Sequence, residues 1–346
     1  MLRLFLVGFG NVAREVVRLL CSDREIFKDF NRQNFVLTAI TTRNHGSLFS
    51  GSGLNGAEAL DYFRKQGRFD ARCAFFNPLE SETLLRQAEY DVLVDLSTLE
   101  LQKRASQTTQ RLEWALQNQR HVVTANKGPI AFHYRKLKKL ALKNQRQLLF
   151  ESTVMDGTPL FNLYKNSLHG AKVVAFSGIV NSTTNFLLTQ MEKGQGLAHA
   201  LTAARKAGMV EANAEHDLQG WDAALKTAIL CNVFFDAQVD PLQIGRDSFD
   251  LVTAAKIAMA KKQGKRWKFV VSARKQAAKI EAKVALQLLN VNHPFFNISE
   301  SSSVLQLELE NLATMRIVQH RPTITDTAYG VIADLLEVLK QERKQP

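Results

Sequence analysis

A carboxylate and an ammonium group stand one helical turn apart in the second half of the chain. The segment from Glu211 to Leu230 reads EANAEHDLQGWDAALKTAIL, and it places Asp222 and Lys226 at the i, i+4 spacing of side chains that share a helix face. The same face continues into the aliphatic residues Ile229, Leu230 and Val233. An apolar surround can tune the proton affinity of both groups, so the pair is a candidate for proton transfer. A surface ion pair is the alternative interpretation.

Near the N-terminus, a glycine-rich turn connects an expected strand to an expected helix. Leu2 to Val7 is a continuous apolar run, GFGNVA from Gly8 to Ala13 follows it, and the helical pattern REVVRLL comes next. This order is the context of the G-x-G-x-x-G/A fingerprint, in which Gly8 makes a tight turn and Gly10 lets the backbone approach a pyrophosphate. The helix N-terminus then stabilises the phosphate charge. We therefore predict dinucleotide binding, with an unliganded tight turn as the alternative.

The residues after the second expected strand, Phe35 to Ile40, indicate which dinucleotide is bound. A carboxylate there would bind the ribose 2′-hydroxyl of NAD and repel a 2′-phosphate. The stretch from Phe35 to Ala57 contains no Asp or Glu, and it places Thr41, Thr42 and Arg43 where the ribose would lie. We predict NADP as the preferred cofactor, with NAD also accepted. Arg43 as a solvated loop residue is the alternative interpretation.

Further strand-loop-helix units follow and predict the fold. Strands are expected at residues 90–96 and 121–123, and helices at 102–118 and 131–144. Gly128-Pro129 is expected to interrupt the regular structure before the second of these helices. Such repeats predict an α/β protein with a Rossmann-like, doubly wound parallel sheet, in which ligands gather at the carboxyl ends of the strands. By that rule, three residues in the loops are site candidates: Ser97, Asn126 and Lys127.

Several motifs together resemble homoserine dehydrogenase. They are VTANKGPI ending at Ile130, ESTVMDGTPLFNL beginning at Glu151, NSTTNFLL beginning at Asn181, and the Glu211 segment, in addition to the glycine turn. The resemblance covers nearly the whole chain, in the short form that lacks a C-terminal regulatory domain. It implies NAD(P)-dependent interconversion of L-aspartate 4-semialdehyde and L-homoserine, in the biosynthesis of threonine and methionine. It also implies a homodimer and an amino-acid substrate.

The resemblance further implies roles for individual residues. The dinucleotide contacts fall to Gly8, Gly10, Asn11 and Val12. Lys127 would lie by the nicotinamide and the substrate, and Lys226 would donate the proton in the reducing direction. Glu211 would bind the amino group of the substrate, and Asp217 and Asp222 would line the substrate pocket. A monovalent cation would be held by Glu151, Val154, Asp156 and Thr158.

Elementary chemistry agrees with the two lysines. Hydride delivery to an aldehyde builds negative charge on oxygen, which an ammonium group can stabilise and then protonate. We predict that Lys226, held by Asp222, gives the proton, with Lys127 as the alternative donor. Two neighbouring assignments have structural alternatives: Asp217 as the N-cap of the following helix, and Thr183 with Thr184 as helix caps.

Three features depart from the family pattern. Ser182 stands where glycine is usual, and Asp156 stands where a small residue is usual. The loop before the last helix, beginning at Gln319, has no glycine before Gly330. A divergent paralogue with an altered substrate or weak activity is therefore an alternative function.

Composition restricts the remaining classes. The 346 residues carry a net charge of +12, whose densest runs at residues 135–143 and 256–268 are typical of solvated helix faces rather than of nucleic-acid contacts. A nucleotide-sensing or nucleic-acid-binding protein is thus the weaker alternative. Three scattered cysteines, no signal peptide and no apolar run long enough to span a membrane predict a cytoplasmic protein.

We expect three parts along the chain. Residues 1–150 form the dinucleotide-binding domain, and residues 151–320 form an α+β domain for substrate binding and dimerisation. Strands at 304–308 and 312–318 belong to the second domain. Residues 321–346 carry a helix at 325–340 that returns to the nucleotide domain.

Overall fold

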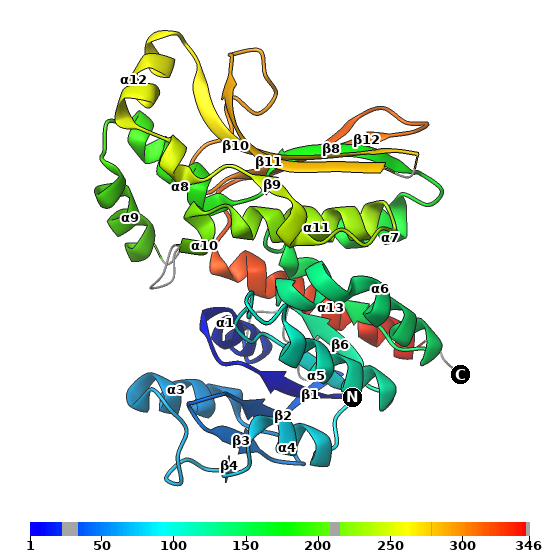
Figure 1. Cartoon of the computed structure of the whole chain (residues 1–346). Helices are drawn as coiled ribbons and strands as arrows, with labels where there is room; N and C mark the ends of the chain where they lie inside the picture. Colours follow the sequence, from blue (N-terminus) through cyan, green and yellow to red (C-terminus); the bar gives the residue numbers. More distant parts are fainter. Residues whose placement is uncertain (23–33, 208–214, 278, 344–346) are drawn as a thin grey trace. The chain divides into compact units, whose positions relative to one another are not determined.

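The computed structural model describes residues 1–22, 34–207, 215–277 and 279–343 (Figure 1). The chain divides into two compact units, the first comprising residues 1–162 and 323–346 and the second residues 163–322. The first division therefore lies after Asn162 rather than after residue 150. The reason is local: Glu151 is bonded forward to the backbone of Phe161 and Asn162, and its own N–H donates to Asp334.

The first unit is built on a seven-stranded sheet of order β4-β3-β2-β1-β5-β6-β7. Strands β2, β1, β5, β6 and β7 are parallel, and β3 and β4 extend the β2 edge in antiparallel pairing. The strands are β1 Leu2–Val7, β2 Phe35–Thr41, β3 Ser47–Phe49, β4 Phe76–Asn77, β5 Val92–Asp95, β6 His121–Thr124 and β7 Leu148–Leu149. The chain order reverses between β1 and β5, which defines the crevice where a doubly wound fold binds its ligand.

Helices flank this sheet in two groups. Helix α1 packs against α3 and α13, whereas α5 packs against α6. Because right-handed crossovers run in opposite directions from β1 to β2 and from β5 to β6, the two groups cover opposite faces. The helices are α1 Asn11–Leu20, α3 Gly56–Gln66, α4 Ser81–Gln87, α5 Ser106–Gln117, α6 Lys127–Lys143 and α13 Ile324–Glu342. Helix α13 contributes Ala328, Val331, Ile332, Leu335 and Val338 to the core of this unit.

Helix α6 begins four residues earlier than its sequence predicts. It starts at Lys127 rather than at Ala131, with Asn126 as N-cap and Pro129 inside the first turn, and a kink at His133, whose φ is −133°, separates this first part from the rest of the helix. The N–H groups of a first helical turn have no partner within the helix, so a proline there costs nothing. The Gly-Pro pair therefore does not break the chain, and Lys127 becomes the first residue of a helix.

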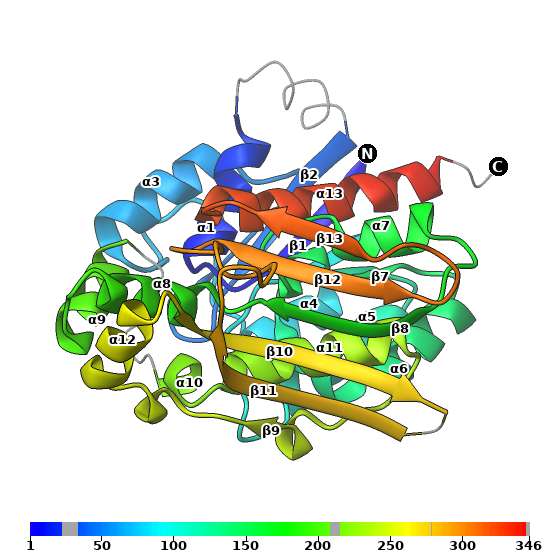
Figure 2. The same ribbon diagram turned by 90° about the horizontal axis from the view of Figure 1, so that it is seen from above.

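The second unit contains a six-stranded sheet of order β13-β12-β8-β10-β11-β9, whose strands lie side by side in Figure 2. The strands are β8 Val173–Ile179, β9 Gly245–Arg246, β10 Arg266–Gln276, β11 Lys279–Leu289, β12 Ser303–Leu309 and β13 Met315–Gln319. The helices are α7 Leu160–Ser167, α8 Ser182–Glu192, α9 Leu197–Lys206, α10 Glu215–Leu218, α11 Trp221–Phe234 and α12 Ala254–Lys262. With the parallel sheet of the first unit, this mixed sheet confirms the predicted α/β fold class.

The most apolar helix of the second unit, α11, lies against strands β10 and β11 (Figure 1). A helix that is apolar on all sides is a buried helix. Its buried residues are Ala223, Ala224, Leu225, Thr227, Ala228, Ile229, Leu230, Cys231, Asn232 and Phe234. Asp222 and Lys226 are the charged exceptions on this helix.

The basic run at residues 256–268 differs from the predicted solvated helix face. Helix α12 ends at Lys262, and the run continues into strand β10, where Lys268 is fully buried. Among the helices that the structure describes, none has the length and apolar character needed to cross a membrane.

Candidate active site

The glycine turn after β1 has the geometry of a phosphate cradle. Gly8 has a φ of 93°, and a Cβ there would lie 2.5 Å from the carbonyl oxygen of Leu96, so only glycine fits. Gly10 is the N-cap of α1, and no side chain caps the helix there. A Cβ at Gly10 would meet no atom within 4 Å. The amide end of α1 is therefore open to a pyrophosphate. Asn11 begins the helix, where its side chain accepts a bond from Arg14, and Val12 is partly buried in the core.

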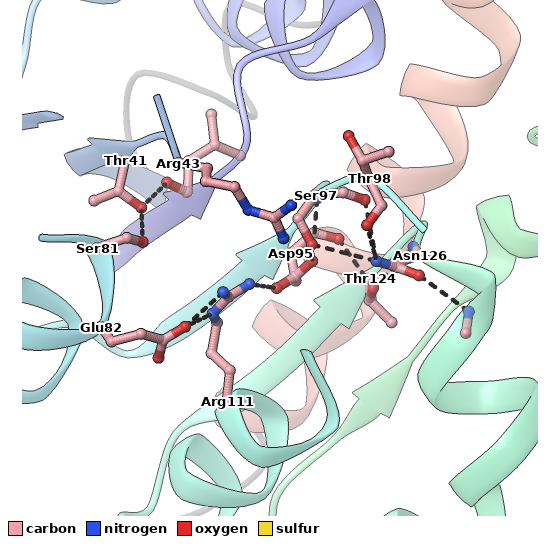
Figure 3. A network of polar contacts seen from close by, with 12 residues as sticks. Thr41, Arg43, Ser81, Glu82, Asp95, Ser97, Thr98, Arg111, Thr124 and Asn126 are labelled. Carbon is pink, nitrogen blue, oxygen red and sulfur yellow. Dashed lines mark hydrogen bonds and ion pairs between the residues drawn. The ribbon is translucent and has the colours of Figure 1, made fainter. Parts of the chain in front are cut away.

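A network of polar side chains connects the carboxyl ends of β5 and β6 (Figure 3). Asp95 is fully buried, and its Oδ1 accepts bonds from the backbone N–H and the hydroxyl of Ser97 at 3.1 and 2.6 Å. Its Oδ2 pairs with Arg111 at 2.6 Å. Arg111 is itself buried, and its other terminal nitrogen binds Glu82 at 2.6 Å. The network fixes the loop after β5, which borders the crevice at the end of β1.

Asn126 joins the same loop to helix α6. Its Nδ2 donates to the carbonyl oxygens of Ser97 and Thr98 at 3.1 and 3.3 Å, and its Oδ1 accepts from the backbone N–H of Gly128 at 3.0 Å. The amide is thus engaged on both sides and only 4% exposed. Lys127, next in the chain, is the first residue of α6. A cation is unfavourable at a helix N-terminus, so helix stability does not explain this lysine.

Arg43 follows β2, and its guanidinium pairs with Glu100, which follows β5. Glu100 lies far from the loop after β2, the place where the fingerprint puts the carboxylate that selects the nucleotide, so the sequence gives no signal for it. The sheet order shows that the two loops flank the same strand, β1.

In the second unit, Asp222 and Lys226 form the predicted pair on α11. The Lys226 Nζ lies 2.9 Å from Asp222 Oδ2, and both side chains are 13% exposed. The same Nζ donates to the carbonyl oxygen of Val180, at the end of β8, at 2.7 Å. The ammonium group is thus held by two acceptors in a mostly buried setting, which is unlike a surface ion pair.

Asn181 connects the carboxylate of Asp217 to that of Asp222. Its Nδ2 donates to Asp217 Oδ1 and to Asp222 Oδ2 at 2.7 and 2.8 Å, and its Oδ1 accepts from the backbone N–H of Thr184 as the N-cap of α8. Asn181, not the threonines, therefore caps α8. Gly220 is the N-cap of α11, so the alternative role of Asp217 as that cap is wrong. Asn181 stood in a motif that the sequence singled out, but its bridging role needed the structure.

Comparison with known proteins decides the family. The family model of homoserine dehydrogenase matches residues 159–336. The chain belongs to the homoserine dehydrogenase family. It is 30% identical over 337 residues to the NAD(+)-dependent homoserine dehydrogenase of Pseudomonas canavaninivorans, with 97% of this chain and 96% of that protein covered.

Solved structures agree with this assignment. The crystal structure of homoserine dehydrogenase from Thermoplasma acidophilum has a TM-score of 0.83 at 25% identity, covering 98% of this chain and 99% of that one. A hyperthermophilic archaeal homoserine dehydrogenase in complex with NADPH has a fold similar to this chain, with a TM-score of 0.80 at 24% identity and 98% of each chain covered. The chain is thus an NAD(P)-dependent oxidoreductase of the homoserine dehydrogenase family.

The segment expected to hold a cation lies in the first unit. Glu151 is 1% exposed, and its carboxylate accepts bonds from the backbone N–H groups of Phe161 and Asn162 at 2.7 and 2.8 Å, at the start of α7. Burial raises the pKa of this carboxyl, and the amide bonds oppose the rise. Asp156 accepts a bond from Thr327 at 3.0 Å. The Thr158 hydroxyl is buried and has no hydrogen-bond partner among the residues that the structure describes.

Two points complete the set of predicted residues. Glu211, the expected ligand of the substrate amino group, lies outside the described residues. Within the described ranges, no three His, Cys, Asp or Glu side chains gather in a way that could hold a metal ion.

Proposed function

We propose that this homoserine dehydrogenase family member interconverts L-aspartate 4-semialdehyde and L-homoserine, with NADP preferred over NAD. The observation that carries the proposal is the cluster on α11, where Lys226 is held by Asp222 and by the Val180 carbonyl. A buried, oriented ammonium group is what reduction of an aldehyde requires of the protein, because negative charge develops on the carbonyl oxygen.

The chain's own residues supply binding and the proton. The reduced nicotinamide, when bound, supplies the hydride. Lys226 stabilises the developing alkoxide and donates a proton to its oxygen, and Asp222 holds the ammonium group in place. Lys127 is proposed to add a second positive charge, which would explain a lysine at the first residue of a helix.

The carboxylates of the second unit suit the rest of the substrate. Asp217 and Asp222 are joined by Asn181, and together they present negative charge of the kind that binds a substrate ammonium group. We propose that both carboxylates line the substrate pocket. Glu211 remains a proposed ligand of the substrate amino group on the strength of the family resemblance.

Support for NADP comes from the end of β2. No carboxylate follows this strand within the loop, and we propose that Arg43 binds the 2′-phosphate. A guanidinium binds phosphate in a two-pronged fashion, which gives both affinity and discrimination. We propose that Ser97 and Asn126 contribute to cofactor binding chiefly by shaping the loop after β5.

A monovalent cation and a second subunit complete the proposal. We propose that a cation is held by oxygens of Glu151, Val154, Asp156 and Thr158. The buried hydroxyl of Thr158, which has no hydrogen-bond partner among the described residues, supports this proposal. Replacing K⁺ and Na⁺ in the assay by a bulky organic cation should then lower the rate. We also propose a homodimer formed through the sheet of the second unit, to be checked by sedimentation velocity.

The test of the function is an assay of homoserine oxidation, followed by absorbance of the reduced nicotinamide. Turnover with both cofactors and a higher kcat/KM for NADP is the expected result. Arg43→Asp should move the preference toward NAD by introducing the carboxylate that favours it. A folded protein without turnover on either nicotinamide would exclude the proposed reaction, and an unchanged cofactor ratio in Arg43→Asp would exclude Arg43 from the phosphate site.

A further inference from the structure

The ion pair between Arg43 and Glu100 crosses the nucleotide crevice. Arg43 follows β2 and Glu100 follows β5, and the sheet order places β1 between these two strands. The carboxyl end of β1 carries Gly8, where the chain order reverses and a doubly wound fold binds its dinucleotide. Figure 3 shows the Arg43 side chain extending from the end of β2 toward the loop that contains Ser97.

The two partners of this ion pair differ in how firmly they are held. The Glu100 side chain is 14% exposed, whereas the Arg43 side chain is 61% exposed. Glu100 is therefore the buried partner of the pair, and Arg43 is the partner that a ligand can reach from solvent. The second carboxylate oxygen of Glu100 is buried and has no hydrogen-bond partner in the part of the chain that the structure describes. Arg43 is thus the cation that compensates a largely desolvated carboxylate.

This arrangement gives the guanidinium two competing anions. A 2′-phosphate that binds Arg43 must take the guanidinium from Glu100. Because the Arg43 end of the pair is exposed to solvent, the phosphate can compete for the guanidinium, but part of its binding free energy is lost in the exchange. NAD carries no phosphate at this position, and its binding does not require Arg43 to leave Glu100.

We propose that Glu100 is a specificity-determining residue for the nucleotide, which by binding Arg43 lowers the affinity for NADP and keeps NAD competitive. This inference rests on the proposed 2′-phosphate site at Arg43. The preference between NAD and NADP then depends on the loop after β5 as well as on the loop after β2, where the nucleotide-selecting residue of this fold usually lies. It also accommodates an NAD-dependent relative at 30% identity.

The test is to measure the binding of NADPH and NADH to the whole protein by calorimetry. Glu100→Gln should lower the Kd for NADPH by about three- to tenfold, the range of an exposed ion pair, and leave the Kd for NADH within about twofold. Asp61→Asn is the matched control, because it removes one negative charge from an ion pair on α3 in the same unit. This control should change neither Kd.

A double-variant cycle separates the mechanism from simple repulsion. In an Arg43→Ala background, Glu100→Gln should have no effect on the Kd for NADPH, because Glu100 then has no guanidinium to hold. An equal gain in that background, or an unchanged NADPH affinity in Glu100→Gln alone, would overturn the inference. Arg43→Ala by itself decides the underlying site: if it leaves NADPH binding unchanged, the proposed phosphate contact fails first.

Loop folding is checked with a second variant. Glu100→Ala removes the carboxylate without leaving a buried amide, and it should reproduce the gain in NADPH affinity if the thermal unfolding midpoint is kept. Two folded Glu100 variants that bind NADPH no better than the native chain would contradict the inference.

Discussion

The polar clusters of the two units differ in how deeply their side chains are buried. In the first unit, Asp95 and Asn126 are 0% and 4% exposed, and they form hydrogen bonds with the loop and the helix around them. In the second unit, Asp222 and Lys226 keep 13% of their side chains exposed. The first arrangement fixes a backbone, whereas the second orients charges that solvent and substrate can still reach.

The difference teaches how to separate scaffold from chemistry among polar residues at strand ends. A buried side chain with all its bonds inside the protein acts by shaping the main chain, which then meets the ligand through N–H groups. In a partly exposed ion pair that a backbone carbonyl holds in place, as in the pair of Asp222 and Lys226, the charged groups can still contact a substrate. Variants of the first cluster should therefore lower stability, and variants of the second should lower turnover.

The largest expected effect is on turnover, from Lys226→Met. Loss of the proton donor should lower kcat by about 10² to 10⁴-fold, because this is the usual contribution of a general acid. Methionine keeps the apolar stem packed, so the free energy of unfolding should change little. Steady-state kinetics with aspartate 4-semialdehyde and binding of NADPH by calorimetry are the measurements, with unchanged nucleotide affinity expected.

Two further lysine variants make this result specific. Lys262→Met, on the exposed face of α12, is the matched control and should keep native turnover. Lys127→Met tests the alternative donor. If Lys127→Met loses turnover while Lys226→Met keeps it, the proton comes from Lys127.

The second effect is on stability, from Asp95→Ala in the first unit. Arg111 is 7% exposed, and of its two ionic partners in the described part of the chain it would keep the half-buried Glu82. Leaving a buried charge without its partner costs about 3 to 5 kcal/mol. Urea unfolding should show this loss in the free energy of unfolding.

A double variant checks that the loss comes from the unpaired arginine. Asp95→Leu combined with Arg111→Met should recover most of the stability, because two apolar side chains replace the buried pair. Loss of equal size in the double variant would mean that the bonds from Asp95 to Ser97 carry the stability instead.

The third effect concerns Lys268, a fully buried lysine in β10 whose Nζ donates to Asn185 Oδ1 at 3.0 Å. Burial lowers the pKa of Lys268 to about 8, and nearby Glu192 only partly offsets this. In the unfolded chain the pKa of a lysine is about 10.4. Between these values the unfolded chain binds more protons, so the free energy of unfolding should rise as pH increases from 8 toward 10.

Comparison with Lys268→Met isolates this contribution. The variant should be more stable than the native chain at pH 7, and the difference should shrink as pH rises and the native lysine loses its proton. Urea titrations at several pH values measure it. A constant difference across this range would show that Lys268 stays charged when buried.

The sequence predicted the sheet, the glycine turn and the α11 pair because these depend on local periodicity and spacing. It could not predict contacts that join distant segments, such as Glu100 with Arg43 or Asn181 with two carboxylates. It also misplaced the start of α6, because Gly-Pro is a break signal in general but is tolerated in a first turn. The prediction of a solvated helix face at residues 256–268 was wrong for a similar reason. The basic residues continue from helix α12 into strand β10, so the run of charge does not indicate where the helix ends.

The smallest expected effect separates the two glycines of the cradle. Gly8→Ala must strain a positive φ and clash with the Leu96 carbonyl, so it should destabilise the first unit by more than about 1 kcal/mol. Gly10→Ala meets no atom within 4 Å, and its stability should be native. Its methyl group instead occupies the open end of α1, where the phosphates approach.

Gly10→Ala should therefore weaken NADPH binding by roughly tenfold, or about 1.4 kcal/mol, without a change in the unfolding midpoint. Calorimetric binding and thermal unfolding are measured on the same preparation. If Gly10→Ala binds NADPH as tightly as the native chain, the backbone at the start of α1 does not contact the pyrophosphate. The cofactor would then depend on side chains at the strand ends, and the contrast between a shaping cluster and a reacting cluster would fail in the first unit.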